Sequence, residues 1–353
     1  MLSKPPELLP ERFIVIDEEG YPVIDQLRVT HEEFGHHLLS HLGRDPSGYF
    51  YTEADGHWVI VEAFDQPLMA QVVEVSEEGV WRAQMPYQFV CEFNLDSLSV
   101  DEWDRFYGRT EKGLPFVMSR KAQALFFEAL DEFTDDSVIY RDQEYKVPPW
   151  LRENPEASSS PFWQEIFCRP EPPPFELGQA NPLLPKVLAQ LRLAKQRVMV
   201  LGCGSGHDAA LFAQQGHLVT AVDFCPEAIR RAKESYAQHK NLRFIQQDIF
   251  SLDHTHRGQY DLIFEHTCYC AISPERRHEL LKLWLNLLTP DGHLLGIFFA
   301  FDQPKGPPFG ASEWEIRERL KNSFRFLYWT RWRKSLPRRQ GKELVIYGQK
   351  KEG

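Results

Sequence analysis

A glycine-rich turn between an apolar run and a helix-like segment constrains the fold of this chain more than any other feature. The apolar run covers residues 197–201, and glycines follow at positions 202, 204 and 206. Glycine has no Cβ, so this turn can bend sharply and approach a ligand closely. A helix-like segment to about Gln215 and a second apolar run at 218–222 come next. The order strand, turn, helix, strand predicts a parallel sheet with helices on both faces.

The same alternation continues toward the end of the chain. Pro226 opens a second helix, as a proline at the first helical position does, and a third helix is expected from Pro274 to Leu288. Further strands are expected at residues 242–245, 260–264, 293–300, 324–332 and 343–348. The last two strands are joined by a connection too short for a crossover helix, so they should form an antiparallel hairpin.

The first 150 residues follow a different pattern. Short runs of β-branched and aromatic residues group together, with helical patterns at 31–42 and 120–133. This predicts an α+β module, which is similar to small β-rich bacterial domains of unassigned function. Ten of the 25 prolines then fall between Val147 and Pro185, where no helix or central strand can run through. We therefore predict an α+β domain at 1–150, a proline-rich linker and arm at 151–190, and the parallel-sheet domain at 191–353.

Charge and cysteine usage limit the classes of partner. The formal net charge of −11 argues against nucleic acid, whose binding depends on neutralising phosphates. The six cysteines form no C-x-x-C pair, so neither a disulfide framework nor a metal site is expected. There is no signal-peptide pattern and no apolar run near 18 residues. We expect a cytoplasmic protein with reduced thiols and no membrane association.

Two carboxylates follow strands of the predicted sheet at the edge where open α/β sheets bind ligands. Asp223 ends the second strand, where a carboxylate can accept both ribose hydroxyls of a nucleoside. Asp248 follows the third strand, where it could accept from an adenine amino group while Ile249 packs on the ring. The pattern therefore favours a nucleoside-containing ligand over this edge.

Two other interpretations of the glycine turn stay open. It could be a tight connection that binds nothing, or it could belong to a dinucleotide-dependent dehydrogenase. The dehydrogenase fingerprint is G-x-G-x-x-G, whereas this chain has G-x-G-x-G and places His207 where the third glycine would stand. The dehydrogenase is therefore the minor alternative.

Four blocks of sequence together resemble the thiopurine methyltransferase family, including its thiol and halide methyltransferase branch. The blocks are residues 162–165 with 174–178, residues 202–208 with 216–217 and 222–223, residues 260–272, and residues 305–309. They span about residues 161–320. The resemblance implies a class I methyltransferase fold: a doubly wound α/β sheet of seven strands whose last strand is antiparallel. It also implies that S-adenosylmethionine is the cofactor, S-adenosylhomocysteine the product and a small molecule the methyl acceptor.

The resemblance also assigns roles to individual residues. Trp163 would pack on the cofactor from an N-terminal arm, and His266 would stand at the methyl end. The remaining cofactor-binding residues would be Gly202, Cys203, Gly204 and Gly206 in the loop, Asp223 and Phe224 at the ribose, and Asp248 and Ile249 at the adenine.

The pair Glu265-His266 departs from the family pattern. Thiopurine enzymes have Asp-Arg there, and thiol and halide enzymes typically have Asp-Tyr. A neutral imidazole cannot replace a guanidinium in pairing with a thiopurine, so we predict methyl transfer to another soft nucleophile, in the first place a thiol. His266, beside Glu265, would accept the thiol proton or would only form the pocket wall. The alternative is O- or N-methylation of a small metabolite, which needs a more committed base that the catalytic pair Glu265-His266 could provide. The N-terminal domain would then be a ligand-binding, protein-binding or regulatory module.

Three other groups of residues resemble metal-binding, redox or anion-binding sites, but we predict mainly structural roles for them. His31 and His36 are five residues apart, so they do not match the i and i+4 histidines of a zinc protease. Cys268 and Cys270 are expected to pack and to line the pocket. The basic stretch at 331–339 is expected to be an exposed turn of the terminal hairpin, and contact of this stretch with an anionic substrate or partner is the minor alternative.

Overall fold

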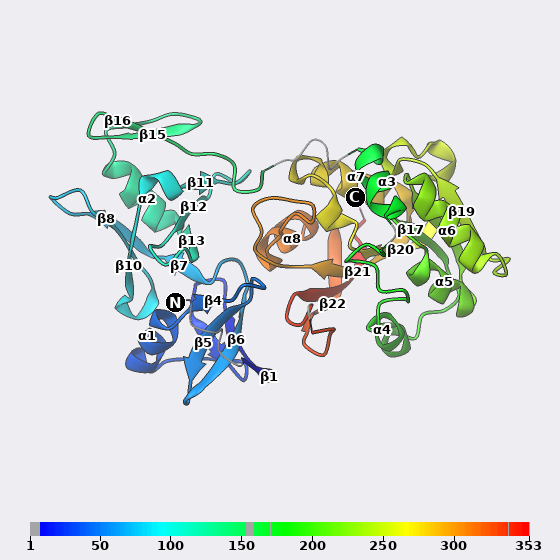
Figure 1. Cartoon of the computed structure of the whole chain (residues 1–353), viewed down its shortest axis with the longest axis horizontal. Helices are drawn as coiled ribbons and strands as arrows, with labels where there is room; N and C mark the ends of the chain where they lie inside the picture. The colour runs from blue at the N-terminus through cyan, green and yellow to red at the C-terminus, as the bar shows by residue number, and fades with distance from the viewer. Residues whose placement is uncertain (1–7, 153–158, 170, 338, 353) are drawn as a thin grey trace. The chain divides into compact units, whose positions relative to one another are not determined.

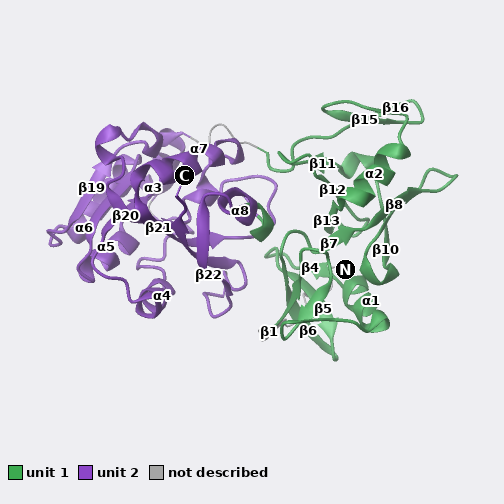
Figure 2. Ribbon diagram, turned by 180° about the vertical axis from the view of Figure 1, so that it is seen from behind, with its two compact units in different colours: residues 1–152, 312–315 green, residues 153–311, 316–353 purple. Residues whose placement is uncertain are grey.

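The computed structural model describes residues 8–152, 159–169, 171–337 and 339–352 (Figure 1). It divides into two compact units (Figure 2). Unit 1 comprises residues 1–152 with 312–315, and unit 2 comprises residues 153–311 with 316–353.

Unit 2 is built on a seven-stranded sheet. In spatial order its strands are β19 (Leu242–Gln246), β18 (Leu218–Asp223), β17 (Arg197–Leu201), β20 (Tyr260–His266), β21 (Leu288–Phe299), β23 (Glu343–Lys350) and β22 (Phe324–Trp332). The pairs from β19 to β21 are all parallel. β23 is antiparallel to both neighbours. The predicted class I methyltransferase sheet, with its last strand reversed and a terminal hairpin, is therefore confirmed.

Helices cover both faces of this sheet. They are α4 (Leu184–Leu191), α5 (His207–Gln214), α6 (Pro226–Tyr236), α7 (Arg277–Leu287) and α8 (Glu313–Leu320). A further helix, α3 (Ser160–Cys168), packs on α6. On β17, Val198 and Val200 join the core formed with α4 and α5, while Met199 and Leu201 join the core formed with α7. Because side chains alternate along a strand, both faces of β17 are buried. This explains why the strand reads as a continuous apolar run.

Unit 1 combines short strands with the helices α1 (Glu32–Ser40) and α2 (Arg120–Glu128). One sheet has the order β3 (Leu27–Arg28), β2 (Pro22–Ile24), β1 (Leu8–Ile16), β6 (His57–Ala63), β5 (Phe50–Ala54) and β4 (Gly43–Arg44). A second has the order β11 (Ser99–Val100), β12 (Phe106–Arg109), β13 (Pro115–Met118) and β7 (Leu68–Ala70). Two three-stranded sheets are β10 (Val90–Phe93), β9 (Trp81–Gln84), β8 (Val72–Val75), and β14 (Glu132–Phe133), β15 (Ser137–Tyr140), β16 (Gln143–Lys146).

One helix prediction in unit 1 extends too far. The helix expected at 120–133 ends at Glu128, and the Ala129 N–H closes its last turn. Residues 132–133 instead form β14, which pairs with β15. The apolar residues at the end of the predicted helix therefore belong to a hairpin, where period-2 pairing replaces helical periodicity. Within the described ranges, no helix has the length and apolar composition needed to cross a membrane.

Candidate active site

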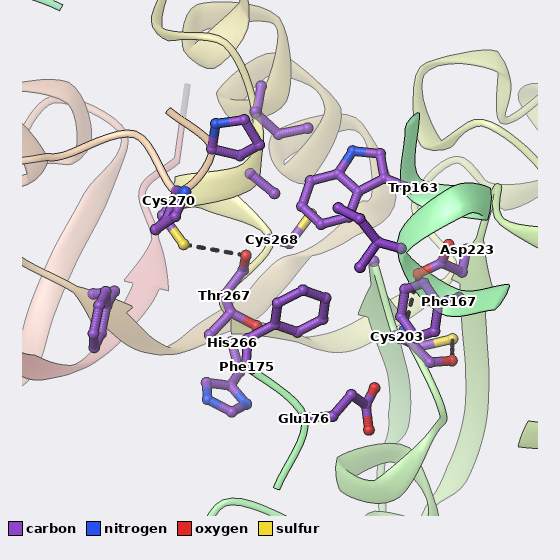
Figure 3. Close-up of a pocket in the computed structure, with 18 of the residues that line it drawn as sticks. Trp163, Phe167, Phe175, Glu176, Cys203, Asp223, His266, Thr267, Cys268 and Cys270 are labelled. Atoms are coloured by element: carbon purple, nitrogen blue, oxygen red, sulfur yellow. Dashed lines mark hydrogen bonds between the residues drawn. The ribbon is translucent and has the colours of Figure 1, made fainter. Parts of the chain in front are cut away.

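Unit 2 contains a cavity of about 590 Å³ at the carboxyl ends of its parallel strands (Figure 3). The predicted site residues that line it are Trp163, Gly202, Cys203, Gly204, Asp223, Phe224, Asp248, Ile249 and His266. Trp163 and Asp223 lie toward one side of the view, and His266 and Cys270 lie toward the other. Two predicted site residues, Gly206 and Glu265, are not among the lining residues.

The glycine loop after β17 requires glycine for two physical reasons. Gly202, Gly204 and Gly206 all have positive φ, at 61°, 51° and 81°. A Cβ on Gly202 would lie 2.7 Å from the Cys268 sulfur, and a Cβ on Gly206 would lie 2.8 Å from the Phe244 ring. Gly206 thus allows close packing behind the loop, whereas Gly202 and Gly204 present backbone to the cavity.

Asp223 fixes the loop as well as facing the cavity. Its Oδ2 accepts the Gly204 N–H at 2.9 Å, and its Oδ1 accepts the Cys225 N–H at 2.9 Å. The residue is 7% exposed, and burial raises the pKa of its carboxyl above the ordinary value. A carboxylate has about four acceptor positions, so Asp223 can still accept two hydroxyls from a ligand.

Asp248 and Ile249 form another part of the cavity wall. Asp248 caps a short 3₁₀ turn at residues 249–251, where its Oδ1 accepts the Phe250 N–H at 3.0 Å. Ile249 is buried with an edge on the cavity. This leaves the second Asp248 oxygen available to a donor on the ligand.

The arm before α4 folds over the cavity and is anchored on α6. The Trp163 and Phe175 ring centroids lie 5.8 Å apart, and Phe167 packs with Cys225 and Ala228. The Gln164 side-chain oxygen accepts the Glu227 N–H at 3.1 Å. These contacts place the indole of Trp163 against the cavity.

Glu176 on the arm was given no role by the sequence analysis. Its Oε1 accepts the Ser205 N–H at 3.3 Å, and its Oε2 lies 3.2 Å from His207 Nε2. Its side chain is 12% exposed and lines the cavity beside Gly204. The 174–178 block marked this segment, but only the folded arm shows that its carboxylate reaches the glycine loop.

His266 has hydrogen-bond partners at both ring nitrogens. Nδ1 lies 2.7 Å from Asp208 Oδ2, so it carries the proton and donates to that carboxylate. Nε2 then accepts, at 3.1 Å from Asn181 Nδ2 and 2.9 Å from Arg339 Nη1. Burial would raise the pKa of Asp208, but its pairing with His266 and the Asn181 N–H outweighs burial, so the pKa is lowered.

Arg339 corrects the expectation of an exposed turn at 331–339. It is 7% exposed and lines the cavity, and its Nη2 donates to the Phe175 carbonyl at 2.9 Å. Its Nη1 also lies 3.4 Å from Glu343 Oε1. Glu343 is 1% exposed, and a buried carboxylate needs a paired cation. Pairing with Glu343 explains why Arg339 is buried, although the local sequence is typical of a basic, solvent-exposed turn.

Glu265 is buried away from the cavity. Adjacent residues of a strand point to opposite faces, so Glu265 and His266 at the end of β20 cannot both face one pocket. Glu265 Oε1 accepts the Tyr269 N–H at 2.9 Å, and the residue is 2% exposed. Burial raises the pKa of Glu265 to about 7. Its catalytic role stays a prediction, without direct access to the cavity.

The 305–309 loop forms a roof over the cavity. Pro307 and Pro308 line it, and the Phe309 N–H donates to the Cys270 carbonyl at 2.6 Å. Arg277 is buried and donates to the Phe309 and Gly310 carbonyls at 3.3 and 3.1 Å. These contacts tie the roof to the turn after β20.

Three cysteines, Cys203, Cys268 and Cys270, also line the cavity. Burial raises the pKa of each of these thiols, which keeps them protonated and weakly nucleophilic. Across the described residues, no three His, Cys, Asp or Glu side chains are grouped as metal ligands. Protonated thiols of this kind pack as small apolar side chains.

Comparisons with known proteins agree with this geometry. The family model described as Thiopurine S-methyltransferase (TPMT) matches residues 158–347. Thiocyanate methyltransferase 1 of Arabidopsis thaliana is 32% identical over 151 residues, which are 42% of this chain and 63% of that protein. Thiopurine S-methyltransferase of Legionella pneumophila is 27% identical over 174 residues, which are 44% of this chain and 77% of that protein. The matches to the first relatives, in Arabidopsis thaliana and Brassica oleracea, span 63% and 61% of their lengths.

Among solved structures, one similar protein is the 1,6-didemethyltoxoflavin-N1-methyltransferase of Burkholderia thailandensis, solved with S-adenosylhomocysteine. It is 26% identical, with a TM-score of 0.39, over 48% of this chain and 77% of that chain. Another is the N-methyltransferase NodS of Bradyrhizobium japonicum, also solved with S-adenosylhomocysteine. It is 15% identical, with a TM-score of 0.45, over 55% of this chain and 100% of that chain.

Proposed function

Since the chain belongs to the thiopurine S-methyltransferase family, we propose that unit 2 transfers a methyl group from S-adenosylmethionine to a small, soft nucleophile, in the first place a thiol. The observation that carries this proposal is the cavity that the arm, the glycine loop and Asp223 enclose. The names of relatives that act on thiocyanate and thiopurines support a soft acceptor atom.

The residues around the cavity fit this cofactor. Asp223 and Phe224 would hold the ribose, Asp248 and Ile249 would face the adenine, and Trp163 would cover the nucleoside. The loop of Gly202, Cys203 and Gly204 would hold the methionine part, beside the Glu176 carboxylate, which suits an ammonium group. When bound, the cofactor supplies a methyl group already activated by its sulfonium.

The protein then contributes alignment and exclusion of water. Phe175, Phe299 and the roof prolines give the cavity apolar walls, which strengthen electrostatic interactions inside it. Holding the nucleophile in line with the methyl group can supply on the order of 7–11 kcal/mol of the barrier. A thiol is a few per cent thiolate near pH 7, so a dedicated base is optional.

The test of the function is a panel of methyl acceptors. Purified protein with S-adenosylmethionine should form S-adenosylhomocysteine when given thiols, selenols or iodide, and should form less with thiopurines. The Asp223→Asn variant serves as the matched inactive control. Absence of product with every acceptor in the panel would contradict the proposal, and turnover restricted to alcohols or amines would favour the O- or N-methylation alternative.

We propose that His266 positions other groups and does not act as a base, since both of its nitrogens already have partners. With a thiol acceptor whose own pKa is above 9, the His266→Ala variant should therefore keep the shape of the wild-type kcat profile between pH 5 and 8. Its KM for the thiol should rise, because Arg339 and Asp208 lose their shared partner. Loss of an ionisation from the kcat profile in this variant would instead identify His266 as a base.

For the remainder of the chain we propose the organisation predicted above: a module at 1–150, an arm at 151–190 and the methyltransferase domain at 191–353. The module would bind a ligand or a protein, or regulate the enzyme. Location in the cytoplasm is likewise a proposal, based on the cysteine usage.

A further inference from the structure

We propose that unit 1 positions the roof of the cavity, because it holds the segment Ser312–Glu315, which follows the roof loop closely in the chain. This inference rests on the proposed function of the cavity, and it gives the N-terminal module a part in acceptor binding. Arg105, Asp65 and Trp314 are then positioning residues, which act on the acceptor through the roof.

The segment 312–315 belongs to unit 1, although the residues before and after it in the chain belong to unit 2 (Figure 2). It contains the start of α8, where the Ser312 hydroxyl oxygen accepts the Glu315 N–H at 3.1 Å. Pro308, which lines the cavity, precedes Ser312 by four residues. A displacement of the segment therefore reaches the roof through a short stretch of backbone.

Trp314 fixes this segment in unit 1. Its backbone N–H donates to the Phe64 carbonyl at 2.9 Å. The guanidinium carbon of Arg105 lies 3.2 Å from the centroid of the Trp314 ring. The Trp103 ring lies at 90° to the Trp314 ring, with 5.2 Å between the centroids. Cation–π and perpendicular aromatic contacts are both attractive, so Phe64, Arg105 and Trp103 together form an anchor for Trp314.

Arg105 is itself fixed by two carboxylates. Its Nη1 lies 2.6 Å from Asp65 Oδ2, and its Nε donates to Asp101 Oδ2 at 2.8 Å. The Asp65 side chain is 3% exposed and the Arg105 side chain is 17% exposed. Because a buried charge needs its partner, the guanidinium cannot move away from Asp65 without a large cost in stability. The ion pair therefore holds the guanidinium against the Trp314 ring.

The roof loop is closed at its neck by two backbone hydrogen bonds. The Phe301 N–H donates to the Ala311 carbonyl at 3.0 Å, and the Ala311 N–H donates to the Phe301 carbonyl at 3.2 Å. One side of this neck follows β21 of the sheet, and the other side continues directly into the segment 312–315. The far end of the loop is tied within unit 2 by Cys270 and Arg277. The anchor in unit 1 thus fixes the side of the neck that the sheet does not fix.

The roof lies toward the acceptor end of the cavity. Its Phe309 N–H donates to the Cys270 carbonyl, and Cys270 lies with His266 on the side of the cavity away from Asp223 (Figure 3). The residues proposed to hold the nucleoside lie instead at strand ends and on the arm. Loosening the anchor should therefore weaken acceptor binding and leave cofactor binding nearly unchanged.

Hydrogen–deuterium exchange of the full-length protein tests this coupling without any substrate. In Trp314→Ala, peptides from residues 302–310 should exchange about tenfold faster, the effect expected from losing a cation–π contact away from water. Peptides from the glycine loop at 202–208 should exchange as in the wild type. Trp314→Phe keeps a ring beneath Arg105 and should show a smaller acceleration.

Steady-state kinetics and calorimetry test the consequence for the acceptor. With thiophenol as the acceptor and saturating S-adenosylmethionine, Trp314→Ala should raise the KM for thiophenol by roughly the same factor of about ten. Its affinity for S-adenosylhomocysteine should change by less than about twofold, since the anchor does not reach the strand ends that carry Asp223 and Asp248. Trp314→Phe should recover most of the wild-type KM.

A control variant separates the anchor from general loosening of unit 1. Trp58→Ala removes another indole of unit 1, which packs on Tyr51 with 5.4 Å between the ring centroids, and should change neither roof exchange nor KM. If Trp314→Ala does not fold, Trp314→Phe should still exchange faster than the wild type at 302–310.

Three outcomes would overturn the inference. They are wild-type exchange of the roof in a folded Trp314 variant, faster exchange with an unchanged KM, and equal effects of the Trp58 and Trp314 variants. Wild-type protein that methylates no acceptor in the panel would instead count against the proposed function, because roof exchange is measured without turnover.

Discussion

Replacing Asp223 with asparagine should lower the affinity of the protein for S-adenosylhomocysteine by about 100-fold or more, since at least two charge-assisted hydrogen bonds are lost. The carboxylate accepts two backbone N–H groups, from Gly204 and Cys225, and is proposed to accept the ribose hydroxyls as well. In asparagine one oxygen becomes an NH₂ group, which would face one of these N–H donors. The variant would therefore lose the shape of the loop together with the ribose contacts.

Calorimetry with S-adenosylhomocysteine measures this effect directly. Asp248→Asn is the matched control, because Asp248 is exposed and accepts a single backbone N–H, from Phe250. Its replacement should cost no more than about tenfold in affinity. Equal affinity of the wild type and the Asp223 variant would remove the basis for placing the sugar at this strand end.

Replacing Glu265 with glutamine should stabilise the protein above neutral pH. Burial raises the pKa of Glu265 from 4.5 to about 7, so the folded state holds a proton that the unfolded chain releases. Its contribution to stability is complete below about pH 4.5 and is lost as the pH rises through about 7. Wild-type protein should therefore lose about 3 kcal/mol of stability from this group between pH 4.5 and 8. Glutamine stays neutral and can still accept the Tyr269 N–H.

Thermal unfolding at pH 5 and pH 8 tests the sign of this effect. The Glu265→Gln variant should resemble the wild type at pH 5 and exceed it at pH 8. Asp208→Asn should be less stable than the wild type by the same amount at pH 5 and at pH 8, because pairing lowers the pKa of Asp208 below its ordinary value of 3.8 and its contribution is complete at both pH values. A Glu265→Gln variant less stable than the wild type at pH 8 would show that the charged carboxylate is the form that the fold requires.

The sequence was most informative where local chain geometry determines the outcome. The strand, glycine turn and helix around Gly202 predict a parallel sheet, and Asp223 follows from its place at the end of the next strand. The short connection between the last two strands predicts their antiparallel pairing. These features depend on residues close together in the chain, so periodicity and turn chemistry suffice to find them.

The features that escaped prediction join residues distant in the chain. Arg339 contacts Phe175, 164 residues away, and His266, 73 residues away. The residues around Arg339 predict a basic turn, and those around Phe175 predict a proline-rich arm. Neither stretch of sequence indicates that the two segments are in contact. The positions of Glu265 and His266, by contrast, could have been predicted from the sequence. Side chains alternate between the two faces of a strand, so only one of two neighbours can face the cavity. A strand ending at His266 cannot direct two successive side chains into one cavity.

The hydrogen bond from Arg339 to the Phe175 carbonyl joins the arm to the wall of the cavity beside His266. On the proposed function the arm covers the cofactor, so the cofactor would enter and leave by displacement of the arm, which would withdraw the carbonyl that orients the guanidinium. This wall of the cavity would then be complete only while the arm is closed. Turnover should then follow a compulsory order, in which the cofactor enters first, the acceptor second, and S-adenosylhomocysteine leaves last.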